Sequence, residues 1–304
     1  MPDQPSSIYR PLDTVFIVGG THGNERTGVS LIRHWQHSPV EIQRETFKTH
    51  LLLANPQAVQ KNTRFIDRDL NRSFLPPPSG SLDTAAYETG LAREIRAKMA
   101  TKHSGQRTFA IDMHTTTSHM GVTLITNTDT VNLAVASAVR KQLEDVRIYC
   151  FADSQRINSC LRAAANGGIG VEIGPIPQGV IRYATIETTR RIVLQILTII
   201  DAFNQGNFVA PDPQTTIYLH DKHIFYPDKT SGHPPVCIHP EIEGHDFERL
   251  EPGQPIFHDL SGRSWSYEGT GLRYPVFINE AAYYHENIAF SLTRKMALAE
   301  LMSI

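Results

Sequence analysis

Apolar and polar positions alternate along this chain in blocks that predict an α/β fold. Short β-branched or aliphatic runs predict buried strands at 15–18, 51–54, 109–111, 122–125 and 170–174. Between them, apolar residues at helical spacing predict helices at 27–36, 85–99, 131–143 and 187–203. Strands and helices that alternate in this way predict a largely parallel or mixed sheet flanked by helices.

The texture of the sequence changes near residue 205. Proline, glycine, histidine and aromatic residues become more frequent, and short strand-like runs appear at 216–219, 255–258 and 274–278. We therefore expect a catalytic α/β domain over 1–205 and a smaller β-rich domain over 206–304. The apolar positions between 279 and 302 predict that the second domain ends in a helix.

Composition narrows the classes of partner. The chain has 304 residues and a formal net charge of −2, so a polyanion such as a nucleic acid is not an expected partner. No apolar stretch approaches the length that crosses a membrane, and no basic-then-apolar leader is apparent. The three cysteines follow no metal-binding spacing, so we expect reduced thiols and a cytoplasmic protein.

The first candidate chemistry follows the first predicted strand. Gly19 and Gly20 end that strand and free the backbone for a tight turn. The turn then presents His22 and Glu25, whose spacing puts both side chains on one side. An imidazole and a carboxylate that converge in this way make two-thirds of a catalytic zinc site of the His₂Glu type, although a lone pair of this kind is more often solvated.

A third ligand is expected from the strand at 109–111. His114 falls where this strand ends, and the functional residues of open α/β sheets gather at the carboxyl ends of strands. Asp112 lies two residues earlier and is a plausible partner for the second ring nitrogen of His114. A strand-end histidine is otherwise usually hydrogen-bonded, so the conjunction with His22 and Glu25 is what favours a metal site.

Polar residues elsewhere suggest recognition of a carboxylate. Asn71 and Arg72 lie in a long polar loop over 61–80, and Arg162 offers a second guanidinium, although each is also compatible with a solvated surface. Glu172 is a charge inside an apolar strand flanked by glycines. It is either a general base beside a metal-bound water or a salt-bridged structural carboxylate.

Four motifs in this order carry a family resemblance. They are Gly19-Gly20-Thr21-His22-Gly23-Asn24-Glu25, Asp69-Leu70-Asn71-Arg72, Glu172-Ile173-Gly174-Pro175 and Asn279-Glu280-Ala281-Ala282-Tyr283-Tyr284. Together they resemble the aspartoacylase/succinylglutamate desuccinylase family of zinc carboxypeptidase-like enzymes over nearly the whole chain. The resemblance implies a zinc-carboxypeptidase-like mixed sheet, and a second domain that narrows the site. Relatives are commonly dimers, so it also implies a homodimer.

The same resemblance implies roles for individual residues. One Zn²⁺ per subunit would be held by His22, Glu25 and His114, with Glu172 as general base and Arg64 polarising the scissile carbonyl. Four more residues match positions that hold the substrate's carboxylates, namely Asn71, Arg72, Arg162 and Tyr283. The implied reaction is hydrolysis of an N-acyl-L-aspartate, typically N-acetyl-L-aspartate.

Three positions depart from the family pattern and bear on side-chain recognition, namely Thr115, Asn158 and Asn287. Rival enzyme readings are a deacylase of N-acyl aromatic amino acids and a succinylglutamate desuccinylase. A non-catalytic protein with a vestigial metal is the remaining alternative, and the completeness of the residue set speaks against it.

Overall fold

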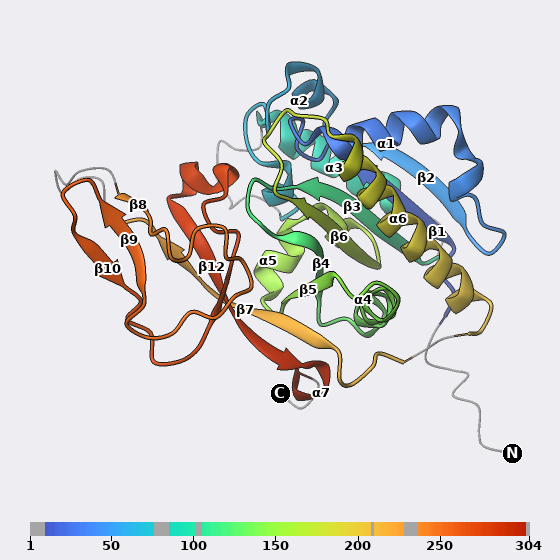
Figure 1. The fold of residues 1–304 in the computed structure, drawn as a ribbon. Helices are drawn as coiled ribbons and strands as arrows, with labels where there is room; N and C mark the ends of the chain where they lie inside the picture. The colour runs from blue at the N-terminus through green and yellow to red at the C-terminus, as the bar shows by residue number, and fades with distance from the viewer. Residues whose placement is uncertain (1–9, 76–84, 101–104, 208–209, 228–235, 302–304) are drawn as a thin grey trace, which may run out of the picture.

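A nine-stranded mixed sheet forms the centre of the molecule in the computed structural model, which describes residues 10–75, 85–100, 105–207, 210–227 and 236–301. Figure 1 shows the sheet and its helices. The strands are β1 (Thr14–Gly19), β2 (Lys48–Leu53), β3 (Thr108–Thr115), β4 (Gly121–Asn127), β5 (Val146–Phe151), β6 (Gly167–Gly174), β7 (Thr216–Phe225), β11 (Tyr274–Val276) and β12 (Ile288–Ala297). The helices are α1 (Arg26–His37), α2 (Pro56–Lys61), α3 (Tyr87–Met99), α4 (Thr130–Gln142), α5 (Ser154–Ser159), α6 (Tyr183–Asn204) and α7 (Leu298–Leu301), with 3₁₀ turns η1 (Pro39–Ile42), η2 (Leu70–Arg72), η4 (Leu161–Ala164) and η6 (Ala281–Glu286).

The strand order brings distant segments together. It runs β11-β12-β7-β5-β4-β6-β3-β1-β2. Strands β2, β1, β3 and β6 are parallel, whereas β4 runs antiparallel to β6. The expected mixed sheet flanked by helices is therefore confirmed.

Alternation along the strands sorts side chains between two layers. Val15 and Ile17 of β1 point to a core that α1, α4 and α6 cover, whereas Phe16 and Val18 point to a second core under α3 and η4. The same alternation in β3 sends Ile111 and Met113 to the first core. Polar side chains at 112 and 114 therefore lie on the opposite face, which is the face of the site.

The C-terminal part is rich in strands, as expected. Strands β7, β12 and β11 extend the main sheet by antiparallel pairing of β12 with both neighbours. Strands β8 (Val236–Ile238), β9 (Pro255–Asp259) and β10 (Ser264–Ser266) form a separate three-stranded sheet, which lies at the end of the molecule away from α1 and β2 in Figure 1. The domain boundary at 205/206 stays a prediction.

The helix expected over 279–302 is wrong. This segment forms the short η6, then strand β12 and only a four-residue helix, α7, with residue 302 outside the described part. The first six residues of β12 are all buried, because β12 lies inside the sheet between β7 and β11. The run over 288–293 alternates large apolar with smaller side chains, which is the strand pattern that the helix expectation overlooked.

Two other expectations concern whole-chain properties. All three cysteines are free thiols, with Cys150 and Cys160 buried and Cys237 exposed. Within the described ranges, no helix combines the length and apolar character needed to cross a bilayer.

Candidate metal centre and substrate cavity

His22 and Glu25 lie in the turn that connects β1 to α1. A Cβ on Gly19 would lie 2.5 Å from the carbonyl oxygen of Gly28, and Gly20 has a φ of +70°. Only glycine allows this approach and this backbone conformation at low cost. Glu25 is the residue directly before α1, so the turn and the helix start together fix its position.

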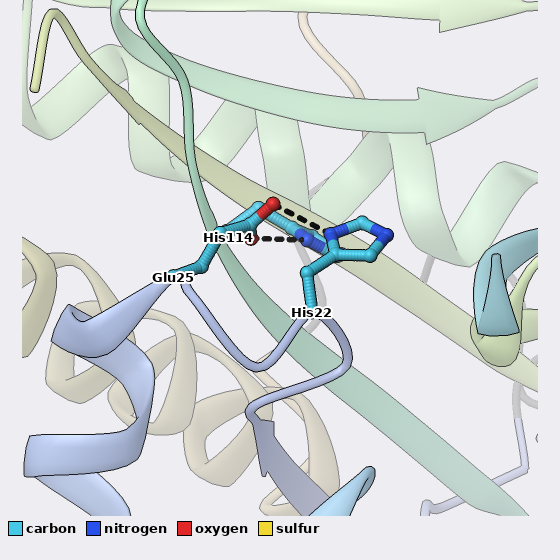
Figure 2. Close-up of side chains that lie close together, drawn as sticks. All are labelled: His22, Glu25 and His114. Atoms are coloured by element: carbon cyan, nitrogen blue, oxygen red, sulfur yellow. Dashed lines mark hydrogen bonds and ion pairs between the residues drawn. The ribbon is translucent and has the colours of Figure 1, made fainter. Parts of the chain in front are cut away.

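His114 reaches the same point from the end of β3. Its Nδ1 lies 2.9 Å from Glu25 Oε2, while His22 Nδ1 lies 2.5 Å from Glu25 Oε1 (Figure 2). Each of the three buried residues offers one ligand atom, and these three atoms lie within 4.8 Å of one another. The structure thus brings together the three residues expected from the sequence.

Two outer carboxylates orient the two imidazoles. Asp112 Oδ2 lies 2.8 Å from His114 Nε2, and Thr21 Oγ1 donates to Asp112 Oδ1 over 2.7 Å. Asp69 Oδ1 lies 3.1 Å from His22 Nε2. Carboxylates at Nε2 favour the tautomer that carries its proton there and leaves the Nδ1 lone pair free for a metal. The sequence indicated Asp112, but we assigned no such role to Asp69.

The electrostatic surroundings favour the charged forms of Glu25 and His114. Burial would raise the pKa of Glu25, but His22 and His114 outweigh burial and lower it. Burial would lower the pKa of His114, but Asp112 and Glu25 raise it well above its usual value. Without a metal these charges are balanced by one another, and a divalent cation would take the place of the imidazole protons.

The donor set fits a zinc ion. Two imidazole nitrogens and one carboxylate, with an orienting carboxylate behind each imidazole, form the His₂Glu set of catalytic zinc sites, which leaves a coordination position for water or substrate. The convergence of three buried donors that face one another, rather than solvent, supports this fit.

A cavity of about 270 Å³ opens beside the cluster. All nine residues expected from the sequence line it. Among them Glu172 lies on β6 directly opposite His114 in the strand register. Burial raises the pKa of Glu172 well above its usual value. Glu25 and Glu280 raise this pKa further, and the opposing effect of His114 does not offset the rise.

Arg64 lies between the cluster and its outer carboxylate. Its Nη1 donates to Glu25 Oε1 over 3.2 Å, and its Nη2 donates to Asp69 Oδ2 over 2.9 Å. These partners raise the pKa of Arg64 against the effect of burial, so the guanidinium stays charged in a dry site. A fixed positive charge here can stabilise negative charge that develops on a carbonyl oxygen.

Asn71 and Arg72 lie on η2, which begins directly after Asp69. Asn71 Oδ1 accepts a hydrogen bond from the backbone of Leu161, and Asn71 Nδ2 lies 3.3 Å from His114 Nε2. Arg72 Nη1 donates to the carbonyl of Asn71, and Arg72 Nη2 lies 3.8 Å from Glu286. Asn71 therefore also ties η2 to η4 and to the metal cluster.

Arg162 and Tyr283 complete the lining that the sequence indicated. A Cβ on Gly170 would lie 2.6 Å from Arg162 Nη1, so the glycines of β6 make room for this guanidinium. In the described part of the chain no ion pair involves Arg162. Tyr283 is buried on η6 and brings the C-terminal part to the cavity.

The three departures from the family pattern lie at different distances from the chemistry. Thr115 and Asn158 line the cavity, and the backbone N–H of Thr115 donates to Glu25. Asn287 is not among the cavity-lining residues described, and its side chain donates to the carbonyl of Tyr226. Sequence reasoning also missed Arg156 as a lining residue, because a six-residue helix after a strand gives no periodic signal.

The fold and the site define an α/β protein with a buried His-Glu-His cluster that could hold a metal ion. The succinylglutamate desuccinylase/aspartoacylase catalytic domain matches residues 11–200, and the barrel-sandwich hybrid domain of the same family matches residues 202–295. This chain belongs to the succinylglutamate desuccinylase/aspartoacylase family.

Individual relatives carry two different substrate names. The chain is 39% identical over 292 residues to a human N-acyl-aromatic-L-amino acid amidohydrolase (carboxylate-forming), covering 94% of this chain and 91% of the relative. It is 34% identical to a probable aspartoacylase of Trichodesmium erythraeum (strain IMS101), covering 95% and 99%. Murine aminoacylase 3 superposes with a TM-score of 0.83 at 35% identity, covering 95% and 97% of the two chains.

Proposed function

We propose that this protein hydrolyses N-acyl-L-aspartates, typically N-acetyl-L-aspartate, to a carboxylate and L-aspartate, with one Zn²⁺ per subunit. Membership of the family supports deacylation of N-acyl amino acids. The acidic substrate rests on one observation above all. Arg162 lies in the cavity beside the metal cluster, and no ion pair of the described residues neutralises it. A half-buried guanidinium in a substrate cavity is well suited to bind a carboxylate of the substrate.

The residues of the chain divide the chemistry among them. Zinc bound to the His22–Glu25–His114 cluster would lower the pKa of water and polarise an acyl carbonyl. Glu172 takes a proton from the attacking water and transfers it to the nitrogen of the leaving amino acid, for which its raised pKa is suited. Arg64 donates to the carbonyl oxygen as negative charge develops there.

Substrate binding then follows from the walls of the cavity. Arg162 holds the side-chain carboxylate of the aspartyl group, and Asn71, Arg72 and Tyr283 hold the remaining polar groups. An N-acyl amino acid with an apolar side chain forms no ion pair with Arg162, whose charge then acts on Asp112 without pairing with it, and this is unfavourable in a partly buried site. The proposal also includes a cytoplasmic location and a homodimer, and analytical ultracentrifugation tests the latter.

A second candidate is deacylation of N-acyl aromatic amino acids. The names of several relatives point to it, and aromatic side chains line part of the cavity, namely Tyr149, Phe151 and Phe277. Such a lining would suit an aromatic substrate side chain. For an aromatic substrate, the side chain would offer Arg162 no carboxylate. The two candidates therefore predict opposite preferences between N-acetyl-L-aspartate and N-acetyl-L-tyrosine.

One assay separates these candidates. We would measure kcat/KM of the zinc-loaded protein for N-acetyl-L-aspartate, N-acetyl-L-tyrosine and N-succinyl-L-glutamate, each with and without a chelator. The proposal expects fast, chelator-sensitive hydrolysis of N-acetyl-L-aspartate. A preference for the tyrosine or glutamate derivative would replace the proposed substrate. Bound metal with no turnover of any of the three would support the vestigial protein instead.

A further inference from the structure

Arg156 is a cavity-lining arginine outside the family motifs of the sequence. It belongs to α5 and lines the same cavity as the metal cluster. Its Cζ lies 5.9 Å from the centre of the Phe151 ring, at the end of β5. Phe151 in turn packs against His220 at a ring separation of 4.9 Å, and His220 packs against His223 at 4.9 Å. The ring of Phe151 therefore lies against the guanidinium of Arg156, and the two imidazoles pack in turn beside that ring.

The surroundings of Arg156 leave its charge uncompensated. No ion pair among the described residues includes Arg156. Burial and the charge of Arg156 lower the pKa of Arg72. Burial, His220 and Arg156 lower the pKa of His223 to about 4, so a cationic group beside Arg156 is disfavoured. Asp69 and Glu286 act in the opposite direction on Arg72 without offsetting this effect, so a further anion beside Arg72 and Arg156 would be favourable.

Arg156 of α5 and Arg162 of η4 line the same cavity but lie against different strands. Arg162 lies against Gly170 of β6, whereas Arg156 lies against Phe151 of β5. Strand β4 lies between β6 and β5, so the two supports are two strands apart, which is about 10 Å. Supports this far apart suit two guanidinia that each bind a separate carboxylate of one substrate. The cavity therefore offers two cationic sides.

We propose that Arg156 is a substrate-binding residue that, together with Arg72, binds the α-carboxylate of the N-acyl amino acid, while Arg162 binds the side-chain carboxylate. This inference rests on the proposed function, because that function assigns Arg162 to the side chain. The remaining carboxylate of an N-acyl aspartate is then the one available to Arg156 and Arg72. The α-carboxylate is common to all N-acyl amino acids, so the role of Arg156 holds for either candidate side chain.

The test compares substrates in which one carboxylate is an amide. For Arg156→Met we expect kcat/KM for N-acetyl-L-aspartate to fall about tenfold or more, the loss of one charge-assisted hydrogen bond. For the α-amide of the same substrate we expect less than about a threefold change, since that contact is already missing. Arg156→Lys, which keeps the charge, should recover part of the loss. Arg263→Met is the matched control, because Arg263 also lies over a ring, that of Trp265, but in the separate three-stranded sheet.

Binding of succinate to the zinc-loaded protein, measured by calorimetry, gives a readout without turnover. Arg156→Met should weaken it about tenfold, and added salt should reduce the difference from the parent protein. Equal losses on the α-acid and the α-amide, or unchanged succinate binding, would overturn the proposal. The proposal would also be overturned if Arg156→Met lowered kcat/KM only for substrates that keep the side-chain carboxylate, whether or not the α-carboxylate is an amide. A parent protein that hydrolyses no N-acyl amino acid would refute the proposed function, while the succinate measurement would still decide whether Arg156 binds a carboxylate.

Discussion

Glu280 of the C-terminal part accepts hydrogen bonds from both the backbone N–H and the hydroxyl of Thr117, over 2.8 and 3.0 Å. Thr117 is the third residue after His114, so this carboxylate ties the loop behind the metal cluster to the C-terminal part. The other oxygen of Glu280 accepts from the N–H of Ala282 and begins η6, which carries Tyr283. One side chain thus positions two walls of the cavity at once.

Glu280→Ala should therefore lower both stability and activity. Buried N–H and O–H groups left unpaired cost about 1–3 kcal/mol, so we expect a lower free energy of unfolding and a kcat/KM reduced about tenfold or more. Urea unfolding and steady-state kinetics measure the two effects. Glu243→Ala is the control, because exposed Glu243 accepts a hydrogen bond from the side chain of Asn279 at the surface. Glu280→Ala indistinguishable from that control would contradict the role of Glu280.

Arg162→Ala should change substrate discrimination more than catalysis. Without the guanidinium, the side-chain carboxylate of aspartate loses its partner, so kcat/KM for N-acetyl-L-aspartate should fall about tenfold or more. The value for N-acetyl-L-alanine should change by less than about threefold. Parallel assays on the two substrates check this. Equal losses on both would show that Arg162 does not contact the side chain.

Asp112→Asn should weaken metal binding while the fold is kept. The amide is the same size but lacks the negative charge that increases the basicity of His114, and such changes typically cost about 10–100-fold in metal affinity. Competition with a fluorescent zinc chelator measures the affinity. Asp67→Asn serves as control, since exposed Asp67 accepts from the backbone of Tyr87, away from His114. Equal zinc affinity in both variants would exclude Asp112 as an orienting group.

The stability of the protein should depend on pH through Asp246. The Asp246 carboxylate accepts from the N–H groups of His119 and Ile278, and burial raises its pKa to about 7. Because the pKa is raised in the folded state, the folded protein binds this proton more tightly than the unfolded chain does. The resulting stabilisation is full below about pH 4 and is lost as the pH rises to about 7.

Urea unfolding between about pH 5 and pH 8 tests this dependence. The free energy of unfolding should decrease with rising pH more steeply in the parent protein than in Asp246→Asn, by up to about 3 kcal/mol between pH 5 and pH 8. The variant should be less stable at low pH, since an amide oxygen can replace only one of the two acceptors. Identical slopes would assign the pH dependence to other groups.

The three cluster residues were predictable because each follows a strong local signal. Gly19 and Gly20 mark the end of β1 before His22, and the apolar run 109–111 of β3 precedes His114. The strand alternation that sends Met113 to the core fixes Asp112 and His114 on the other face. These signals depend on a few neighbouring residues and elementary sheet geometry, so a single sequence carries them.

The remaining parts of the site depend on contacts between distant segments. Glu280 meets Thr117 across 163 positions of the chain, and Asp69 meets His22 across 47. No local pattern reports such a contact. The wrong helix over 279–302 has a different cause, because the alternation of large apolar and smaller side chains over 288–293 is a local strand signal that the apolar spacing of the longer segment obscured.

The most direct test of the account is the Glu172→Gln variant, assayed for both zinc content and turnover of N-acetyl-L-aspartate. Glutamine keeps the shape of the side chain but cannot take a proton from water. We expect one zinc per subunit, as in the parent protein, and a kcat reduced about 10²–10⁴-fold. Turnover within a few-fold of the parent, with zinc retained, would contradict the assignment of Glu172 as the general base and with it the central mechanism.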